Sequence, residues 1–137
     1  MNYHQIMLEN QSIYTKHFFE KIQDLKLSHG QPKILEYLLE HEGCMQKDIA
    51  RACMIEPPTV TSLLSKMEKD HLIIRKSLDG NRRSLHIFLT DEGNKKAKIV
   101  KDTFTKIDED ILSILSDKEK RELLNLLKKV NNRLWKF

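Results

Sequence analysis

Hydroxyl, amide and basic side chains are concentrated between residues 46 and 90 of this chain. The segment Pro57–Lys69 carries short polar and basic residues at helical spacing, namely Thr59, Thr61, Ser62, Ser65 and Lys66. A turn-like Asp79-Gly80-Asn81 is followed by Arg82 and Arg83. Groups of these kinds hydrogen-bond to phosphate oxygens and to the base edges exposed in the grooves of duplex DNA. The pattern therefore predicts a surface that reads nucleic acid.

The charge distribution agrees with this prediction. Residues 46–90 hold eight Lys/Arg and five Asp/Glu, a net charge of +3, out of 24 and 20 in the whole chain. The remaining residues hold sixteen and fifteen, a net charge of +1. Positive charge gathered in one segment is what neutralisation of phosphates requires. A solvated basic surface without a nucleic-acid role would have the same composition.

Two helices and a basic ribbon must position these side chains. A first short helix is predicted from Gln46 to Cys53, and a second follows the turn at 54–56. In the second helix Val60, Leu63, Leu64 and Met67 share one face, and Pro57 and Pro58 occupy the first turn, where a missing N–H costs nothing. Two strands around residues 72–76 and 82–89 then form the ribbon. A helix-turn-helix with such a ribbon places its second helix in a major groove.

Long amphipathic helices flank this module. Apolar residues at three-, four- and seven-residue steps predict a helix from Tyr3 to Leu25. Ser28 and Gln31 have the spacing of a capping box for the next helix, which Gly43 ends. Thr90 caps a further helix, and Ser116 and Glu119 form a second capping box for the last one. The expected apolar side of the helix after Thr90 consists of Ile99, Phe104, Ile107, Ile111 and Ile114.

The flanking helices predict a homodimer. A module of this size cannot cover the apolar stripes of helices that make up about half the chain, so residues 1–27 and 91–137 are predicted to be dimerisation helices. A dimer also has the two-fold axis that matches two half-sites on the order of 34 Å apart. A monomer that packs its own termini together is the alternative.

Several motifs in order resemble the MarR family of winged helix-turn-helix regulators over nearly the whole chain. They are Leu27-Ser28-His29-Gly30-Gln31, Lys47-Asp48-Ile49-Ala50, Thr59-Val60-Thr61, Leu64-x-x-Met67-Glu68, Leu72-Ile73, Asp79-Gly80-Asn81-Arg82-Arg83 and Leu89-Thr90-Asp91-Glu92-Gly93. The resemblance implies a single domain over 1–137, mainly α with a small β wing. Its winged helix-turn-helix region spans 28–90, with a recognition helix at about 57–69 and a wing at about 73–89. It also implies a homodimer, a palindromic operator in double-stranded DNA, and a small amphipathic or aromatic effector, an oxidant or a metal.

Three departures from the family pattern matter for the site. Met54 stands in the turn where relatives often have Gly, and His71 stands where they have Gly after the recognition helix. His tolerates a left-handed backbone better than most residues do. Ser62 replaces a frequent Arg, which removes a bidentate reader of guanine. The operator preference of relatives is therefore not carried over to this chain.

The remaining candidate contacts each have an alternative. We expect one of Arg82 and Arg83, beside Asn81 in the turn, to enter the minor groove, and the other to pair with Asp79 and shape the wing. Gln46 and Lys47 are interpreted as phosphate anchors or as N-terminal capping residues. Arg75 and Lys76 on the first wing strand contact either the DNA backbone or only water.

Effector chemistry is less well specified by the sequence. Tyr14, His17, Phe18 and Tyr37 are the expected lining of an effector pocket, although core packing accounts for them equally well. Cys44 and Cys53 are interpreted as reduced thiols, with Cys53 packed in the core and Cys44 a weaker sensor candidate. A metal-responsive alternative would use His17, His29, His41 and Cys44, with Glu40 and Glu42, but their spacing matches no zinc motif. No cofactor is expected.

Enzymatic function is not expected, because the sequence has no Gly-rich phosphate loop, nucleophile motif or recurrent acid–base set. The sequence contains no run of about 18 apolar residues, so it predicts no membrane span. The N-terminal segment Met1-Asn2-Tyr3-His4-Gln5 lacks the charged and apolar regions of a signal peptide. We therefore expect a cytoplasmic, sequence-specific transcriptional regulator, a repressor released from a palindromic operator by a small effector. Metal or redox control of the same fold, non-specific DNA coating and protein assembly are the alternatives.

Overall fold

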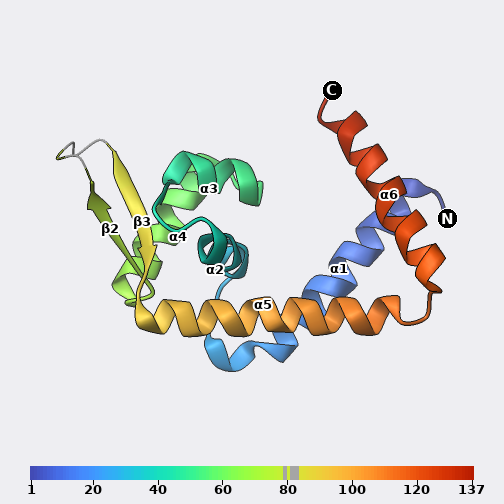
Figure 1. Cartoon of the computed structure of the whole chain (residues 1–137), viewed down its shortest axis with the longest axis horizontal. Helices are drawn as coiled ribbons and strands as arrows, with labels where there is room; N and C mark the ends of the chain where they lie inside the picture. The colour runs from blue at the N-terminus through green and yellow to red at the C-terminus, as the bar shows by residue number, and fades with distance from the viewer. Residues whose placement is uncertain (79, 81–83) are drawn as a thin grey trace. The chain divides into compact units, whose positions relative to one another are not determined.

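The computed structural model describes residues 1–78, 80 and 84–137, which form two compact units, residues 1–104 and 105–137 (Figure 1). The predictions made for Asp79, Asn81, Arg82 and Arg83 lie outside the described residues. The first unit contains the helix-turn-helix and the strands. The second contains the end of one long helix and the last helix of the chain.

The first helix is shorter than the sequence predicts. α1 spans Tyr3–Lys21 and begins with a capping box in which Asn2 and Gln5 exchange backbone and side-chain hydrogen bonds. The predicted last turn instead forms a separate 3-10 helix, η1 (Gln23–Leu25), which ends at Lys26 with φ 55°. The apolar periodicity continues through this turn even though the hydrogen-bonding pattern changes, so periodicity could not locate the break.

The capping box predicted at Ser28 is only half present. The Ser28 N–H donates to Oε1 of Gln31 at 3.0 Å, but α2 (Gln31–Glu40) begins after Gly30 and has no side-chain cap. Gly30 takes the cap position with φ 93°, a conformation that favours glycine, so Gln31 is the first residue of the helix rather than the third. The prediction was therefore wrong about where this helix begins.

α3 (Gln46–Cys53) and α4 (Pro57–Lys69) form the helix-turn-helix. Met54 closes the turn between them in a left-handed conformation, with φ 57°. The core under these helices consists of fully buried apolar side chains from α2, α3 and α4, namely Ile34, Leu35, Leu38, Ile49, Val60, Leu64 and Met67. Burial of each side chain of this size stabilises the fold by about 1.5–3 kcal/mol. This core therefore holds the backbone of α4 in place and leaves its other face exposed.

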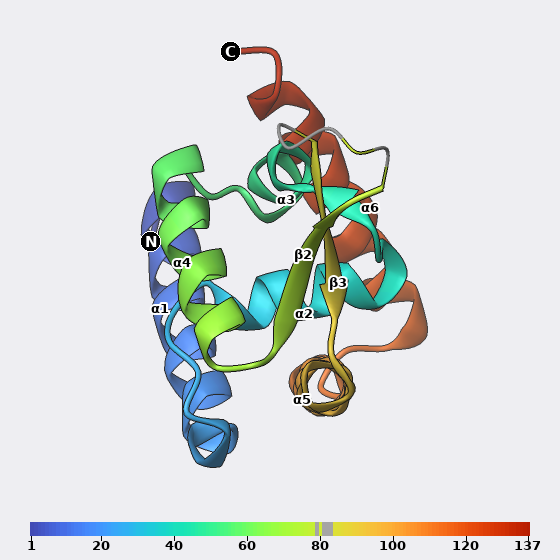
Figure 2. The ribbon, with the colours of Figure 1, turned by 90° about the vertical axis from the view of Figure 1, so that its left-hand side faces the viewer.

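The wing is part of a three-stranded antiparallel sheet, not the two-stranded ribbon predicted. β1 (Cys44–Met45), β2 (Ile73–Ser77) and β3 (Leu85–Leu89) lie in the order β1-β3-β2. Figure 2 looks onto β2 and β3. Cys44 is opposite Ile87, and the Gly43 N–H donates to the Ile87 carbonyl at 2.8 Å. A two-residue strand has too few positions to show a period of two, so β1 left no signal in the sequence.

The long helix α5 (Asp91–Leu112) begins in close contact with His71 and Leu72, which follow α4. Thr90 caps it as predicted, since its Oγ1 accepts the Gly93 N–H at 2.9 Å and donates to the His71 carbonyl at 2.6 Å. Any Cβ added at Gly93 would lie 1.9 Å from the Leu72 carbonyl oxygen. Glycine is therefore required at this position by a close approach between two backbones.

The predicted apolar side of α5 needs correction. Ile107 is buried and Phe104 is half-buried, as predicted, and Ala97 and Val100 are buried with them. Ile99 and Ile111 are exposed in this chain, and Ile114 lies beyond the end of the helix. Ile99 is five residues before Phe104 and lies about 140° from it around the helix, away from the face that Phe104, Ile107 and Ile111 share.

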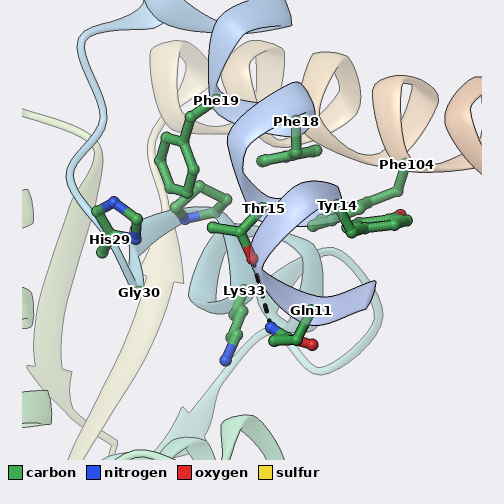
Figure 3. Close-up of a pocket in the computed structure, with 10 residues that line it drawn as sticks. Gln11, Tyr14, Thr15, Phe18, Phe19, His29, Gly30, Lys33 and Phe104 are labelled. Carbon is green, nitrogen blue, oxygen red and sulfur yellow. Dashed lines mark hydrogen bonds between the residues drawn. The ribbon is translucent and has the colours of Figure 1, made fainter. Parts of the chain in front are cut away.

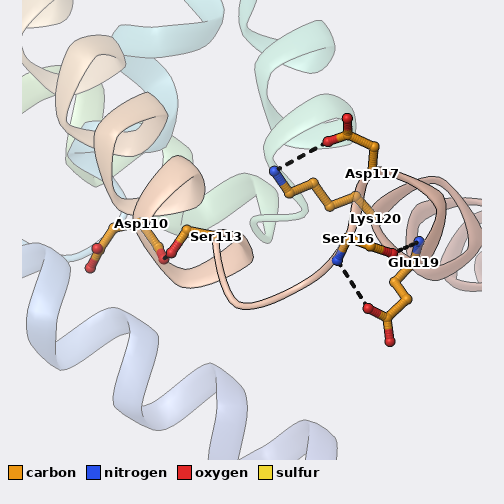
Figure 4. Close-up of polar contacts among 6 residues, drawn as sticks. All are labelled: Asp110, Ser113, Ser116, Asp117, Glu119 and Lys120. Carbon is orange, nitrogen blue, oxygen red and sulfur yellow. Dashed lines mark hydrogen bonds and ion pairs between the residues drawn. The ribbon is translucent and has the colours of Figure 1, made fainter.

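The second unit contains α6 (Asp117–Leu134) and the turn that precedes it (Figure 4). The predicted capping box is confirmed: the Ser116 N–H donates to Oε1 of Glu119 at 2.9 Å, and Ser116 Oγ accepts the Glu119 N–H at 3.1 Å. In the same view, Ser113 Oγ donates to the Asp110 carbonyl. The apolar residues of α6 and its end are exposed in this chain, namely Leu123, Leu124, Leu126, Leu127, Val130, Leu134 and Trp135.

Candidate nucleic-acid interface

α4 has one buried face and one exposed polar face. Val60, Leu64 and Met67 are fully buried on its inner side. All five polar residues predicted to contact DNA on this helix are exposed, namely Thr59, Thr61, Ser62, Ser65 and Lys66. The helix therefore presents hydroxyl and ammonium groups to solvent from a backbone held by the core.

Hydroxyl groups in the first turns of α4 donate back to the helix. Thr61 Oγ1 donates to the Pro57 carbonyl at 3.1 Å, and Ser62 Oγ donates to the Pro58 carbonyl at 3.3 Å. Side chains that hydrogen-bond the carbonyl four residues earlier have their one hydroxyl hydrogen engaged. The oxygens of Thr61 and Ser62 keep lone pairs that can accept a hydrogen bond from outside the helix.

The start of α3 contacts α4. Gln46 Nε2 donates to Thr61 Oγ1 at 2.5 Å, and Lys47 is exposed. N-terminal capping was the alternative role predicted for these two residues. In the structure, Asp48 takes that role: its carboxylate accepts the Met45 N–H at 3.0 Å. Gln46 is thus joined to one of the candidate reading residues of α4.

The first wing strand is held to α4 by an ion pair. The Arg75 side chain is only 20% exposed and its Nη2 lies 3.1 Å from Oε1 of Glu68. The hydrogen bond from Arg75 holds the pKa of the Glu68 carboxyl below its usual value, despite some burial that opposes this shift. Arg75 is therefore directed toward α4. Its neighbour Lys76 places Nζ 4.5 Å from the centre of the Phe88 ring, within the range of a cation–π contact.

A cavity of about 260 Å³ lies beside α1 and α2 in the first unit (Figure 3). Tyr14 and Phe18, two of the predicted effector residues, line it. The full lining is Gln11, Tyr14, Thr15, Phe18, Phe19, His29, Gly30, Pro32, Lys33 and Phe104. The other two predicted residues lie elsewhere: His17 is 3.6 Å from Glu20, and Tyr37 packs against His41.

The cavity has aromatic walls and one cationic group. The rings of Phe18 and Phe104 stack with centroids 4.0 Å apart, and Phe19 lies 4.3 Å from His29. Among the described residues that line the cavity, Lys33 is the one Lys or Arg, and none is Asp or Glu. Phe104 was missed as a pocket residue because a position 86 residues from Phe18 in the chain gives no local pattern that joins the two.

Both cysteine thiols have a raised pKa in this environment. Burial raises the pKa of the Cys44 thiol to about 11, and the neighbouring Asp48 carboxylate acts in the same direction. Burial also raises the pKa of the Cys53 thiol to about 11, and this side chain is buried as predicted. A thiol with a raised pKa supplies little of the reactive thiolate at neutral pH.

Two further findings bear on the alternatives considered from the sequence. Within the described ranges, no three His, Cys, Asp or Glu side chains gather closely enough to hold a metal ion, so the set around His29, His41 and Cys44 is not brought together. Among the helices of the described residues, none is both long enough and apolar enough to cross a bilayer.

The chain resembles known proteins in both sequence and fold. The model of the MarR family matches residues 27–85. The regulator PecS of Dickeya dadantii is 38% identical over 86 residues, which cover 63% of this chain and 52% of PecS, about half its length. The regulator BilQ of Clostridium symbiosum is 26% identical over 93% of this chain and 87% of its own.

The structural likeness extends over almost the entire chain. The structure of S. aureus MepR in complex with DNA has a TM-score of 0.89, is 26% identical, and covers 98% of this chain and 99% of its own. The fold class predicted from the sequence, mainly α with a winged helix-turn-helix, is confirmed. The family match over residues 27–85, the relatives and the fold together make this chain similar to regulators of the MarR family.

Proposed function

We propose that this chain is a sequence-specific DNA-binding transcriptional regulator that inserts α4 into a major groove. The observation that carries the proposal is the polar face of α4, with Thr59, Ser62 and Lys66 exposed opposite a fully buried apolar face. The ammonium group is suited to phosphates, and the hydroxyl oxygens are suited to donors on base edges. The likeness to S. aureus MepR, whose structure contains DNA, supports DNA binding by this chain.

The proposed active form is a homodimer. Apolar side chains of α6 are exposed in the single chain, as are Ile6, Leu8 and Ile13 on α1. A second copy of the same chain would cover such surfaces, and it would supply the two-fold axis required to bind a palindrome. Sedimentation of the purified chain tests this: a monomer at micromolar concentration would contradict it.

The proposed regulation is repression relieved by a small aromatic anion. The cavity at Phe18 and Phe104 has ring surfaces for an aromatic body and the Lys33 ammonium for an acidic group. In the proposed mechanism the effector binds better to a conformation whose recognition helices no longer fit the operator.

DNA titration tests the proposed function. We would measure binding of the purified chain to the DNA upstream of its own coding sequence and to a scrambled duplex, each at two salt concentrations. A specific reader is expected to prefer the promoter by roughly 10³-fold or more. Equal affinity for both duplexes would instead indicate DNA coating, and absence of binding would indicate a module for protein assembly.

Charge-matched variants separate α4 from the rest of the surface. Lys66→Gln should weaken promoter binding and, if Lys66 contacts a phosphate, reduce the salt dependence by about one unit of slope. Lys98→Gln removes the same charge from an exposed position on α5 and is the control. Equal effects of the two variants would mean that only overall charge matters, which would contradict a specific role for α4.

A further inference from the structure

We infer that Gln46 is a positioning residue for Thr61 and that it fixes the Thr61 hydroxyl as a hydrogen-bond acceptor toward DNA. The base that Thr61 contacts is then one that presents an amino group in the major groove, adenine or cytosine. This inference rests on the proposed function, in which α4 lies in that groove. It adds a residue outside the recognition helix to the determinants of base preference.

The hydroxyl hydrogen of Thr61 is already used in a hydrogen bond within α4. A threonine hydroxyl has one hydrogen to donate and two lone pairs. The hydrogen is directed to the Pro57 carbonyl at 3.1 Å, and Gln46 Nε2 lies 2.5 Å from the same oxygen. Because the hydroxyl has already donated, Gln46 must be the donor in the second contact, and it occupies one lone pair. One lone pair remains for a further partner.

The two contacts come from different elements, so they hold the hydroxyl from two sides. Pro57 is in the first turn of α4, whereas Gln46 is the first residue of α3, fifteen positions earlier in the chain than Thr61. Gln46 is half-buried, but Thr61 is exposed. The hydroxyl is therefore restrained while the residue that carries it remains accessible to DNA.

A restrained acceptor distinguishes between ligands. Phosphate oxygens are acceptors only, so a hydroxyl without a free hydrogen gains nothing by contact with a phosphate. In the major groove, adenine N6 and cytosine N4 carry amino donors, whereas guanine O6 and N7 and thymine O4 are acceptors. The Thr61 oxygen thus matches the amino-bearing bases and opposes the others. Without Gln46, the hydroxyl could rotate and donate to a base acceptor.

The test measures base preference rather than affinity alone. We would bind the full-length chain to its operator with all four bases substituted in turn at each position of one half-site. The wild-type chain should prefer adenine or cytosine at one position by about threefold to tenfold, the effect of one net hydrogen bond. Thr61→Val should abolish that preference while the salt dependence stays unchanged.

Two substitutions of Gln46 isolate its role. Gln46→Ala removes the donor, and Gln46→Glu keeps the size of the side chain but can only accept. Both substitutions should reduce the preference among bases at the operator position that Thr61 contacts. When Thr61 is already replaced by Val, Gln46→Ala should cause no further change in that preference. The matched control is Thr103→Val on α5, which removes a hydroxyl that donates to the carbonyl four residues earlier, as that of Thr61 does, and should leave this preference intact. Thermal unfolding of each variant confirms that it folds.

The outcomes are distinguishable. If the Gln46 variants lower affinity for every sequence by the same factor, Gln46 is a phosphate anchor or a purely structural residue and the inference is overturned. Retention of the preference in Gln46→Glu would show that Thr61 donates to residue 46 and would overturn it as well. A wild-type chain with no preference for any duplex would overturn the proposed function itself, and the inference with it.

Discussion

Arg75 donates two hydrogen bonds to the carboxylate of Glu68, from Nε to Oε2 at 3.3 Å and from Nη2 to Oε1 at 3.1 Å. The pair joins β2 of the wing to the end of α4. A guanidinium that contacts both carboxylate oxygens restricts orientation as well as distance. The ion pair therefore restrains the orientation of β2 relative to α4. The DNA contact predicted for Arg75 would have to be made by a guanidinium that already contacts Glu68.

Glu68→Gln should destabilise the chain by about 0.5–1 kcal/mol near neutral pH, the range for a partly exposed ion pair. The folded pKa of Glu68 is lowered, so its stabilising contribution is present above the ordinary glutamate pKa of about 4.3 and is lost as pH falls through the lowered value. Urea unfolding of both proteins at several pH values measures this. The difference between them should shrink toward acid pH; a difference that grows there would contradict the assignment.

Gly93→Ala should destabilise the chain by about 1–3 kcal/mol, the range for an overpacked site. Alanine favours a helix by about 1 kcal/mol over glycine, but its Cβ would lie 1.9 Å from the Leu72 carbonyl oxygen. The start of α5 or the end of the α4 segment must then move. Urea unfolding checks the prediction, with Lys98→Ala as an exposed control in the same helix. A more stable Gly93→Ala variant would disprove the close approach.

Met54→Gly should stabilise the chain by up to about 1 kcal/mol. Met54 has φ 57° and is 68% exposed, so it bears the cost of a left-handed backbone and little of its side chain is buried. Met54→Ala is the matched control, because it also removes the side chain but keeps the Cβ that causes the strain. Equal stability of the two variants in thermal unfolding would exclude relief of backbone strain as the cause.

Lys33→Met should weaken binding of an aromatic carboxylate, with benzoate as the probe and benzamide as its neutral counterpart. The ammonium of Lys33 is the one Lys or Arg charge in the lining, so its removal should reduce affinity for benzoate by about threefold to tenfold and leave benzamide unchanged. Calorimetry with both ligands measures this. A parallel loss for both ligands would mean that the substitution altered the cavity rather than its charge.

Alkylation of the cysteines should be slow in the folded chain. A thiol with a pKa of about 11 is ionised to about one part in 10⁴ at neutral pH, compared with a few per cent for an unperturbed thiol. Iodoacetamide should therefore react at least about 100-fold more slowly with the folded than with the denatured chain. Cys44→Ser and Cys53→Ser assign the rates to individual thiols. Rapid alkylation of either cysteine in the folded state would contradict this prediction and would support redox control.

Local features of the fold were predictable because their causes are local. Thr90 and the pair Ser116 and Glu119 were recognised as caps from spacing alone, and the structure confirms both. His71, which stands where the resemblance to the MarR family places Gly, has φ 61°, a left-handed conformation. Capping and backbone conformation depend on residues within one or two turns, so they are visible as short patterns in the sequence.

Contacts between distant segments were not predictable in the same way. The sequence by itself determined the apolar face of α4, its polar face and the order of the module, because helical periodicity separates buried from exposed positions. Only the tertiary structure decided that Gln46 contacts Thr61, that Arg75 is paired with Glu68, and that Phe104 rather than Tyr37 lines the cavity beside Phe18. Such partners are set by how whole elements pack, and that packing is a collective result of many side chains that no short segment encodes.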